Sequence, residues 1–563
     1  MSEASAGEGE SGSRYDVVVI GGGINGAGIA RDAAERGLDV LLLEQDDFSA
    51  ATTAWSSRLI HGGLRYLEYA EISLVYESLH ERRHLLEAAP HLVHPLKLVI
   101  PVYRGARRGK ALIRAGMLAY DLLSLGKELP GHDMLSRREL LAEEPGMLAE
   151  GLRGAAAYYD AQVPWAERLV IENLVAAERA GAVLRNYCRV EALCDGSGTM
   201  DGVEYRDLAT GERHRVHAPV VVNAGGPWVD RVLKGLPARL PRLMGGTKGS
   251  HVVVSPFEGA PKSAFYIEAE ADGRPMFVIP WAGLYLIGTT DIRYSGDPAD
   301  ARASGEEVDY LLGEANRVFP RAGLGRESVH YTYCGVRPLP WEEGPEGAIT
   351  RKHIIREHDD VARGLMSIIG GKLTTYRHLA EEVVDRIGRL LERDLPGCPT
   401  DDEPLPGGAD FEEARERLAA AGVVADETAG HLLSVYGSRA LEIAEMAVTE
   451  PALGEIVCQR TGAIAAEVIF SLEQEHARTL DDLLQRRMMI GLGPQLGRDV
   501  LDAVASVAGD HLGWSDEERD AAKSAYHQRL DRFQVPDRTF QTFETYLPGR
   551  RRAMVAAACG LPR

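Results

Sequence analysis

A glycine-rich turn close to the N-terminus constrains the fold of this chain more than any other feature of its sequence. Asp16–Ile20 is a short apolar segment that predicts a buried strand, and Ile29–Arg36 has the pattern of a helix. Between them lie Gly21, Gly23 and Gly26, in the spacing G-x-G-x-x-G. In such a strand–loop–helix the first glycine permits the turn, the second lets the backbone approach a pyrophosphate, and the third lets the helix pack closely on the strand. The turn therefore predicts a βαβ unit that binds a dinucleotide.

The residue that closes the second strand of this unit narrows the choice of dinucleotide. Val40–Leu43 reads as that strand, and Glu44 follows it. A carboxylate at this place accepts hydrogen bonds from a ribose 2′-hydroxyl and repels a 2′-phosphate, which argues against NADP. The helix N-terminus offers unpaired N–H groups and the positive end of its dipole to the phosphates. The glycine loop alone does not separate FAD from NAD.

Two later segments favour FAD. Val220–Gly226 (VVVNAGG), with Gly225 near its end, reads as a strand that ends in small residues. Gly370–Gly371 is another place where the backbone can approach a ligand closely. A flavin dinucleotide that runs through a whole domain needs contacts this far along the chain, whereas NAD needs mainly the first loop. We therefore expect FAD, bound by Gly225 and Gly371 as well as by the N-terminal loop.

The length, charge and cysteines of the chain argue against several other classes of protein. A chain of 563 residues is expected to form about two to four hydrophobic cores. A net charge of −21 argues against nucleic acid as the main partner. The six cysteines form no C-x-x-C pair, so no metal site is predicted, and their scatter fits a reducing compartment. No apolar run reaches the roughly 18 residues of a membrane-spanning helix, and a cytoplasmic location is expected.

Further motifs, in the same order along the chain, resemble those of the FAD-dependent glycerol-3-phosphate dehydrogenases. They begin with GGGINGAG at residues 21–28 and end with RTLDDLLQRR at Arg478–Arg487, so the resemblance covers nearly the whole chain from Tyr15 onward. Between these two lie SSRLIHGGLRYLE at Ser56–Glu68, GSHVVV at Gly249–Val254, FVIPW at Phe277–Trp281, IGTTD at Ile287–Asp291, GVRPL at Gly335–Leu339 and GGKLTTYR at Gly370–Arg377. Two departures are Arg58, where lysine is common, and Cys334, where a small or hydroxyl residue is common.

The resemblance implies an α/β fold joined to an all-α part. It consists of a glutathione-reductase-like FAD-binding domain, an antiparallel-sheet substrate-capping domain and a C-terminal helical domain. Strand-like segments between Gly245 and Thr290 agree with the capping sheet, and helical periodicity from Phe411 to about Tyr526 agrees with the helical domain. The expected boundaries are a disordered tail at 1–14, the FAD-binding domain at 15–95, 150–230 and 345–393, the capping domain at 96–149 and 231–344, a linker at 394–409 and the helical domain at 410–563.

The reaction implied by the resemblance is the oxidation of sn-glycerol 3-phosphate to dihydroxyacetone phosphate, with electrons passing from FAD to a membrane quinone. A phosphate monoester requires closely placed Arg and Lys side chains, and the arginine fork binds it bidentately. By the resemblance, the substrate pocket is lined by residues that stand in matched motifs beside glycines or turn residues: Arg65, Tyr66, Arg337 and Lys372. Outside such motifs an Arg or Lys is more often a surface charge.

The oxidation also requires a base. Loss of the C2 hydride to the flavin is accompanied by loss of the hydroxyl proton, and a neutral imidazole is a suitable acceptor. His251, in GSHVVV, is the first candidate and is expected to contact the substrate, with a cationic Arg337 stabilising the developing alkoxide. The alternative is a hydrogen-bonded strand histidine. Ser56, His61 and Thr374 are expected at the cofactor by the resemblance, although Thr374 equally suits a helix cap.

One basic, amphipathic segment suggests how the chain reaches an apolar quinone. Tyr103–Gly126 combines basic residues with large apolar ones: Arg104, Arg107, Arg108, Lys110 and Arg114 with Leu112, Ile113, Met117, Leu118 and Leu122. In an acidic protein this composition predicts peripheral attachment to the anionic inner face of the cell membrane. The alternative is an ordinary half-buried helix. Arg550–Arg552, beside MVAAAC, is a weaker candidate for the same role.

Three other functions stay open on the sequence. A glycerophosphate oxidase shares these motifs but passes electrons to oxygen, and only the basic segment favours the dehydrogenase. A flavin-binding regulatory subunit without turnover is disfavoured by the set of predicted pocket cations, and an NAD-linked dehydrogenase by the distant glycine contacts. The sequence does not give the oligomeric state: the helical domain either supports a homodimer or covers one face of the molecule.

Overall fold

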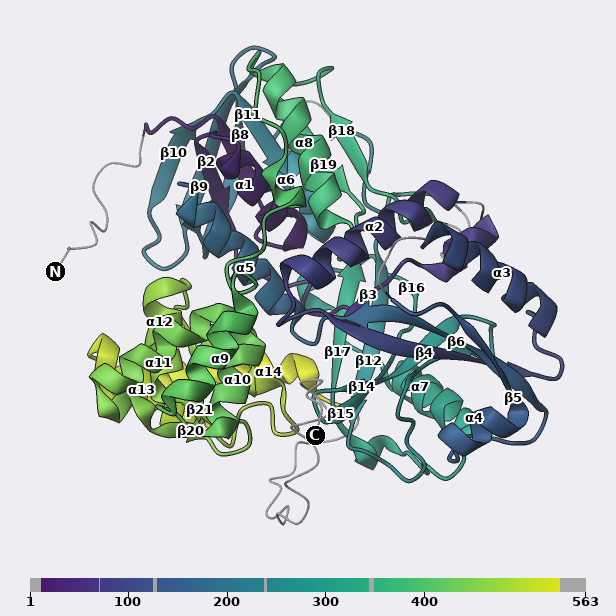
Figure 1. Ribbon diagram of the computed structural model, residues 1–563. Coiled ribbons are helices and arrows are strands. Elements are labelled where there is room, and N and C mark those ends of the chain that lie inside the picture. The colour runs from purple at the N-terminus through teal and green to yellow at the C-terminus, as the bar shows by residue number, and fades with distance from the viewer. Residues whose placement is uncertain (1–11, 70, 125–128, 237–239, 344–348, 537–563) are drawn as a thin grey trace.

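The computed structural model of the chain describes residues 12–69, 71–124, 129–236, 240–343 and 349–536. The chain folds into two sheet-containing parts and a third part that is almost entirely helical (Figure 1). Of the predicted tail at residues 1–14, only residues 12–14 lie in the described part, where Gly12 donates a hydrogen bond to the carbonyl of Arg215 (2.8 Å). None of the described helices has the length and apolar character needed to cross a bilayer.

The predicted first strand, β1 (Val17–Ile20), lies inside a six-stranded sheet with the order β18-β19-β11-β1-β2-β7. Five strands run parallel, and β18 pairs antiparallel with β19 at one edge. The other strands are β2 (Val40–Leu43), β7 (Val183–Arg185), β11 (Val220–Asn223), β18 (Ile354–Glu357) and β19 (Leu365–Ile369). Every residue of β1 is buried because both faces of the sheet are covered: Val17 and Val19 pack on one side, Val18 and Ile20 on the other.

Helices cover one face of this sheet, and a small antiparallel sheet covers the other (Figure 1). The helices are α1 (Ile24–Glu35), α5 (Ala166–Arg179) and α8 (Tyr376–Leu390). The opposite layer contains β8 (Cys188–Asp195), β9 (Met200–Asp207), β10 (Arg213–His217) and the short helix α6 (Val229–Val232). The helix predicted at Ile29–Arg36 begins five residues earlier, because the glycine loop itself forms the first turns and burial outweighs the low helix propensity of glycine.

A second sheet of ten strands forms the capping part of the molecule. Its strands are β3 (Leu59–Ile60), β4 (His94–Tyr103), β5 (Asp133–Ser136), β6 (Leu152–Gln162), β12 (Thr247–Val254), β13 (Ala264–Glu268), β14 (Pro275–Trp281), β15 (Leu284–Gly288), β16 (Ile292–Arg293) and β17 (Val329–Arg337). The antiparallel pairing of β12 to β15 confirms the sheet predicted between Gly245 and Thr290. The domain boundaries stay a prediction; β6, which falls within the range 150–230, pairs with β4 in this sheet.

The two faces of the large sheet have different partners. Val252 and Val254 of β12 pack toward α4 (Arg137–Glu143) and α7 (Gly305–Val318), whereas Val253 faces the opposite side. On that side the sheet packs against α2 (Ile72–Ala88), α3 (Lys110–Leu123) and the helical domain. The alternation along β12 follows from the two-residue period of a strand.

The C-terminal part begins at the predicted residue, Phe411, and its last helix extends a little beyond the predicted end. Its helices are α9 (Phe411–Ala421), α10 (Asp426–Tyr436), α11 (Ala440–Thr449), α12 (Ala465–Gln474), α13 (Leu501–Leu512) and α14 (Asp516–Leu530), with a two-stranded hairpin of β20 (Ile456–Cys458) and β21 (Ala463–Ile464). The predicted linker 394–409 is irregular but packed, since Leu405 is buried and the N–H of Gly407 donates to Glu172 (2.6 Å).

Buried ion pairs join this helical domain to the dinucleotide-binding sheet. Asp47, just after β2, accepts hydrogen bonds from Arg486 and Arg487, which end the motif RTLDDLLQRR. Arg168 of α5 donates to both carboxylate oxygens of Glu475 (2.6 and 2.8 Å). Because all of these groups are buried, their charges must be matched inside the interface.

Candidate active site

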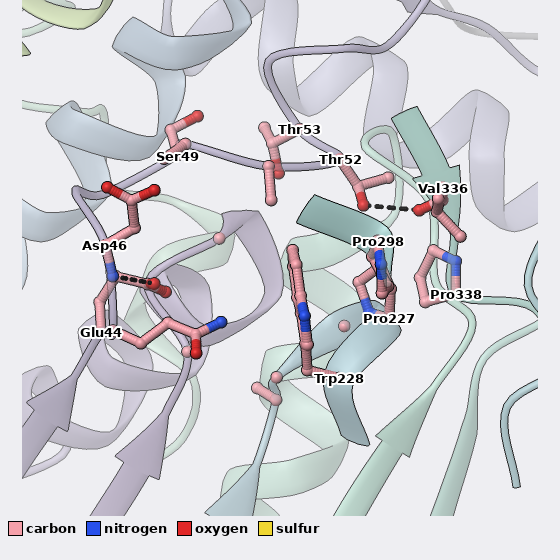
Figure 2. Close-up of a pocket in the computed structure, with 18 of the residues that line it drawn as sticks. Glu44, Asp46, Ser49, Thr52, Thr53, Pro227, Trp228, Pro298, Val336 and Pro338 are labelled. Atoms are coloured by element: carbon pink, nitrogen blue, oxygen red, sulfur yellow. Dashed lines mark hydrogen bonds between the residues drawn. The ribbon is translucent and has the colours of Figure 1, made fainter. Parts of the chain in front are cut away.

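A cavity of about 530 Å³ lies at the carboxyl ends of β1, β2 and β11, which is where ligands bind in open parallel sheets. Four of the predicted cofactor residues line it: Gly21, Gly23, Glu44 and Gly225. Figure 2 shows Glu44 and Asp46 on one side, Trp228 in the middle, and Val336 and Pro338 on the other side. The cavity therefore runs from the dinucleotide-binding sheet to β17 of the capping sheet.

In the glycine loop, backbone segments lie so close together that there is no room for a Cβ at Gly21 or Gly26. Gly21 has a φ of +112°, and a Cβ there would lie 2.6 Å from the carbonyl oxygen of Ala224 on the neighbouring strand end. A Cβ on Gly26 would lie 1.9 Å from the carbonyl oxygen of Gly21, so the first turn of α1 contacts β1 directly. Gly23 is the N-cap of α1 and makes no side-chain cap; the N–H of Ile24 donates to Thr53 Oγ1 (3.2 Å), and Gly23, Ile24 and Asn25 at this end of the helix line the cavity.

Glu44 occupies the position expected of a ribose acceptor. Its carboxylate accepts hydrogen bonds from the N–H groups of Gly22 (2.7 Å) and Asp46 (2.8 Å), which fix its orientation at the cavity wall (Figure 2). Burial raises the pKa of Glu44 to about 7. Hydroxyl donors from a ribose stabilise the ionised form of such a carboxylate.

The remaining lining fits a long, polar cofactor. The buried atoms Ser49 Oγ and Asn25 Oδ1 have no hydrogen-bond partner among the described residues, and both residues line the cavity. Gly371, with a φ of +91°, also lines it, and a Cβ there would lie 2.7 Å from Asn25 Nδ2. The cavity thus reaches from Glu44 to Gly371. Gly371 is one of the distant backbone contacts for which FAD was expected rather than NAD.

Three predicted cofactor residues lie near this cavity in different ways. Ser56 lines it, and its backbone carbonyl accepts a hydrogen bond from Tyr333 (2.8 Å). His61 and Thr374 are not part of its lining; instead the N–H of His61 donates to Thr374 Oγ1 (3.2 Å) and so ties the two segments together. Burial lowers the pKa of His61 to about 4, so its ring is neutral. Thr375, not Thr374, is the N-cap of α8, and it makes no side-chain cap.

Arg337 lies at the end of β17, between the cavity-lining residues Val336 and Pro338. Its guanidinium donates to Asp291 Oδ1 (3.0 Å) and to Thr289 Oγ1 (3.0 Å). A Cβ on Gly249 would lie 2.3 Å from its Nη2, so glycine makes room for the arginine. The fork is therefore held in a fixed orientation beside the cofactor cavity.

Two more arginines, which the sequence analysis did not identify, contact Asp291. Arg351 donates to Asp291 Oδ2 (3.2 Å), and Arg274 donates to the backbone carbonyl of Asp291. The Nη1 of Arg351 is buried without a hydrogen-bond partner among the described residues. The attraction of Arg337 and Arg351 holds the pKa of Asp291 below its ordinary value. Asp291 belongs to the quoted motif IGTTD and was a detectable signal, whereas nothing in the sequence marks Arg351.

His251 is buried in β12, with its ring over Gly288 of β15 and 4.7 Å from the ring of Tyr333. Its Nε2 is 2.9 Å from the hydroxyl of Ser57, and its Nδ1 has no partner in the described part of the chain. Burial, together with the positive charges of Arg337 and Arg58, holds the pKa of His251 well below its ordinary value. The imidazole is therefore neutral at physiological pH, the state that a base requires.

Lys372 lines the cofactor cavity, and its side chain also contacts the predicted substrate residue Tyr66. Its ammonium nitrogen is 3.9 Å from the centre of the Tyr66 ring and 3.1 Å from Ser78 Oγ. Burial lowers the pKa of Lys372 to about 7. Arg65 lies in the short helix η1 (Leu64–Tyr69), and its side chain is outside the described part of the structure.

The glycine loop at the carboxyl end of a parallel sheet, the long cavity beside it and the second sheet that closes this cavity define the class of protein: an FAD-dependent oxidoreductase. Comparison with protein families agrees. The model described as FAD dependent oxidoreductase matches residues 16–377, and the model described as the C-terminal domain of alpha-glycerophosphate oxidase matches residues 398–519.

Relatives of known name narrow this class. The chain is 45% identical over 540 residues to a glycerol-3-phosphate dehydrogenase of Synechocystis sp. (93% of this chain, 97% of the relative). It is 36% identical over 534 residues to an aerobic glycerol-3-phosphate dehydrogenase of Staphylococcus epidermidis (92% and 95%). The X-ray structure of the glycerol-3-phosphate dehydrogenase from Bacillus halodurans complexed with FAD is similar, with a TM-score of 0.76 at 30% identity (94% and 97%). The chain belongs to the FAD-dependent glycerol-3-phosphate dehydrogenase family, and its cofactor is FAD, which confirms the predicted family, fold class and cofactor.

Proposed function

We propose that the chain oxidises sn-glycerol 3-phosphate to dihydroxyacetone phosphate with FAD, and that the electrons then pass to a membrane quinone. The observation that carries the proposal is the pair of arginines at Asp291 beside the cofactor cavity, with the neutral His251 close to Arg337. Arg337 and Arg351 share Asp291, and Lys372 lines the cavity itself. The two arginines share one carboxylate, so the group of three carries a net positive charge, which suits an anionic substrate.

The cations have the chemistry required for a phosphate monoester. The substrate phosphate carries nearly two negative charges at neutral pH, and arginine forks bind such a group through two parallel hydrogen bonds. Arg337 is already oriented by Asp291, so little side-chain entropy is lost when it binds. Arg65, Tyr66, Arg337 and Lys372 remain our proposed substrate residues, and we add Arg351 to them.

We assign the removal of the substrate hydroxyl proton to His251, assisted by Arg337. When bound, FAD supplies the hydride acceptor. The unpartnered Nδ1 of His251 is available to take the hydroxyl proton, because the pKa of His251 is held well below its ordinary value. A guanidinium beside the developing alkoxide lowers the cost of losing that proton. His251 and Arg337 are therefore the proposed catalytic residues.

Anaerobic reduction of the bound flavin tests the reaction. Glycerol 3-phosphate should bleach the flavin absorption bands without oxygen, and a quinone analogue should restore them. Absence of bleaching would favour a flavin-binding subunit without turnover. Fast restoration by oxygen with peroxide release would favour a glycerophosphate oxidase instead, and flavin-independent reduction of NAD would favour an NAD-linked enzyme.

The KM for glycerol 3-phosphate is expected to rise as the pH is raised through about 7, the pKa of Lys372. Below this pH the side chain is an ammonium ion that attracts the phosphate, and above it the side chain is a neutral amine. Initial rates measured between about pH 6 and pH 9 give the KM at each pH. In Lys372→Arg the guanidinium stays charged, so this pH dependence should vanish. A KM of the parent enzyme that does not change over this range would contradict the assignment.

The surface of α3 supports attachment to a membrane. Met117 and Tyr120 on one side of the helix are buried, and Ile113 and Leu123 pack against the same core, so this side of α3 faces the protein. Along the opposite side Leu112, Leu118 and Leu122 are 61%, 55% and 67% exposed. The intervening exposed residues Ala111, Ala115 and Ala119 are also apolar. The neighbouring helix α2 adds the exposed residues Ile72 and Tyr76. We call these residues of α2 and α3 the apolar face.

Basic residues beside the apolar face make a lipid bilayer its expected occupant. Arg104, Arg107, Lys110 and Arg114 are all exposed. In a chain of net charge −21, a local basic group next to exposed leucines suits anionic lipid headgroups and the acyl boundary beneath them. The proposed location is therefore the inner face of the cell membrane, where quinone is available. Arg550–Arg552 lie outside the described residues, and a homodimer remains a proposal.

Substitutions on this face should separate lipid binding from catalysis. In the triple variant Leu112→Ser, Leu118→Ser and Leu122→Ser, binding to vesicles of anionic phospholipid should fall at least tenfold, because about 0.8 kcal/mol is lost per buried methylene. Flavin reduction by glycerol 3-phosphate should not change. The matched control is Leu512→Ser, at another exposed leucine (46%), at the end of α13 and outside the cavity lining. Equal vesicle binding by the triple variant and the parent would refute attachment through α3.

A further inference from the structure

The end of the helical domain forms part of the wall of the cofactor cavity. Residues 528–536, which we call the strap, comprise the last turn of α14, the short helix η12 (Asp531–Phe533) and the residues that follow it. Gln528, Arg529 and Arg532 of the strap line the cavity together with the glycine loop. A domain that lies more than 400 residues away from that loop in the sequence thus contributes to the same cavity.

The strap is fixed at both ends. On the side of the dinucleotide-binding sheet, Arg529 forms an ion pair with Asp46, two residues after Glu44 (2.9 Å). On the side of the capping sheet, Thr332 of β17 donates to the carbonyl of Gln534 (3.0 Å). The buried ring of Phe533 packs 5.2 Å from the ring of Trp55. The strap therefore joins both sheets across the cofactor cavity.

Arg532 is held inside this arrangement without an anionic partner. Its guanidinium lies 4.7 Å from the centre of the Trp55 ring, and Trp55 itself lines the cavity. Among the described residues no carboxylate lies within ion-pair distance of Arg532. Burial and the nearby charges of Arg529 and Arg302 lower its pKa to about 10, which still leaves it charged at neutral pH. Arg532 is partly buried, and the more distant Asp481 and Asp46 only partly offset the two arginines. Such a cation is costly unless an anion joins it.

The cofactor supplies such an anion in its diphosphate. The glycine loop, residues 21–28, contains no lysine or arginine, so it offers the phosphates only N–H groups and a helix dipole. Thr53 accepts a hydrogen bond from the N–H of Ile24 at the N-terminus of α1 (3.2 Å), and Trp55 follows two residues later. The residue under Arg532 thus belongs to the loop that contacts the phosphate-binding turn.

We propose that Arg532 is a cofactor-binding residue, which neutralises the diphosphate of FAD and makes the strap a retaining element of the cofactor site. The helical domain then has a function at the cofactor, in addition to covering one face of the molecule. The proposal depends on FAD alone and is independent of the substrate and of the electron acceptor.

The affinity of the apoenzyme for FAD tests the proposal. In Arg532→Gln the Kd for FAD, followed by flavin fluorescence, should rise at least tenfold, since a hydrogen bond to a charged group is worth about 1.5–3 kcal/mol. The matched control is Arg519→Gln, on the preceding helix α14 but paired with Asp510 (3.0 Å) and absent from the cavity lining. Its Kd should stay within about twofold of the parent value. An unchanged Kd in Arg532→Gln would overturn the proposal.

Two further measurements separate binding of the diphosphate from other roles. If Arg532 only supports the fold, Arg532→Gln lowers the thermal midpoints of apoenzyme and holoenzyme equally, which contradicts the proposal; we expect the holoenzyme to lose more. If Arg532 acts on the flavin ring, the reduction potential shifts while the Kd stays constant, which also contradicts it. If Arg532→Gln does not fold, the parent protein and Arg532→Lys test the proposal instead. The Kd of the parent for FAD must then rise with added salt, and Arg532→Lys must retain most of the affinity.

Discussion

Replacing Arg337 with alanine is expected to lower kcat/KM for glycerol 3-phosphate by about a thousandfold while FAD stays bound. Removing one donor to a developing oxyanion typically costs a hundred- to a thousandfold in rate, and Arg337 also contributes to phosphate binding in our proposal. The carboxylate of Asp291, its present partner, keeps its ion pair with Arg351 and so is not left unpaired. Steady-state kinetics with the flavin content of the same sample provide the measurement.

The substitution Arg337→Lys refines this result. Lysine retains the charge but loses the planar fork that contacts both Asp291 and Thr289. Its kcat/KM should therefore lie between those of the parent and the alanine variant. If the alanine variant turns over at the parent rate, or if it loses its flavin to the same extent as its activity, Arg337 is not a catalytic residue.

The cofactor half of the site was predictable from the sequence because its determinants are local. Gly21, Gly26 and Glu44 act within one βαβ unit, and the spacing of these residues fixes their geometry before any tertiary contact is known. The start of α1 was placed too late, since propensity disfavours a helix at glycines and the packing of Gly26 on Gly21 overrides it.

The rest of the site depends on contacts between segments that are far apart in the sequence. Arg351 was missed because its role depends on Asp291, sixty residues earlier, and no local pattern connects the two. Arg532 was missed for the same reason: its place beside Trp55 follows from the way the helical domain docks. The motif RTLDDLLQRR was recognised only by resemblance, and the structure gives it a physical role, since its two terminal arginines bind Asp47.

The helical domain is joined to the dinucleotide-binding part of the molecule by ion pairs that are buried from solvent. Glu475 is 2% exposed, and its carboxylate accepts hydrogen bonds from Arg168 of α5 (2.6 Å) and from Arg439 (2.7 Å). These two arginines, with Arg487, hold the pKa of Glu475 at about 2, below its ordinary value of 4.5. A carboxyl group whose pKa is depressed in the folded state stabilises the fold above its unfolded pKa, and this contribution is lost as the pH falls through the folded pKa.

Glu475→Gln is therefore expected to destabilise the holoenzyme by about 3–5 kcal/mol, because it leaves two buried arginines, Arg168 and Arg439, with Glu172 as their one shared counter-charge among the described residues. Differential scanning calorimetry at neutral pH measures the effect as a lower thermal midpoint. Glu473→Gln is the matched control, in the last turn of α12 two residues before Glu475, but 47% exposed and paired with His511 at 3.5 Å, so its midpoint should hardly change. The gap between Glu475→Gln and the parent should be constant above about pH 5 and should narrow from 4.5 down to about 2. Equal midpoints for the Glu475 and Glu473 variants would show that the buried pairs do not hold the helical domain in place, and the strap over the cofactor would then need another anchor.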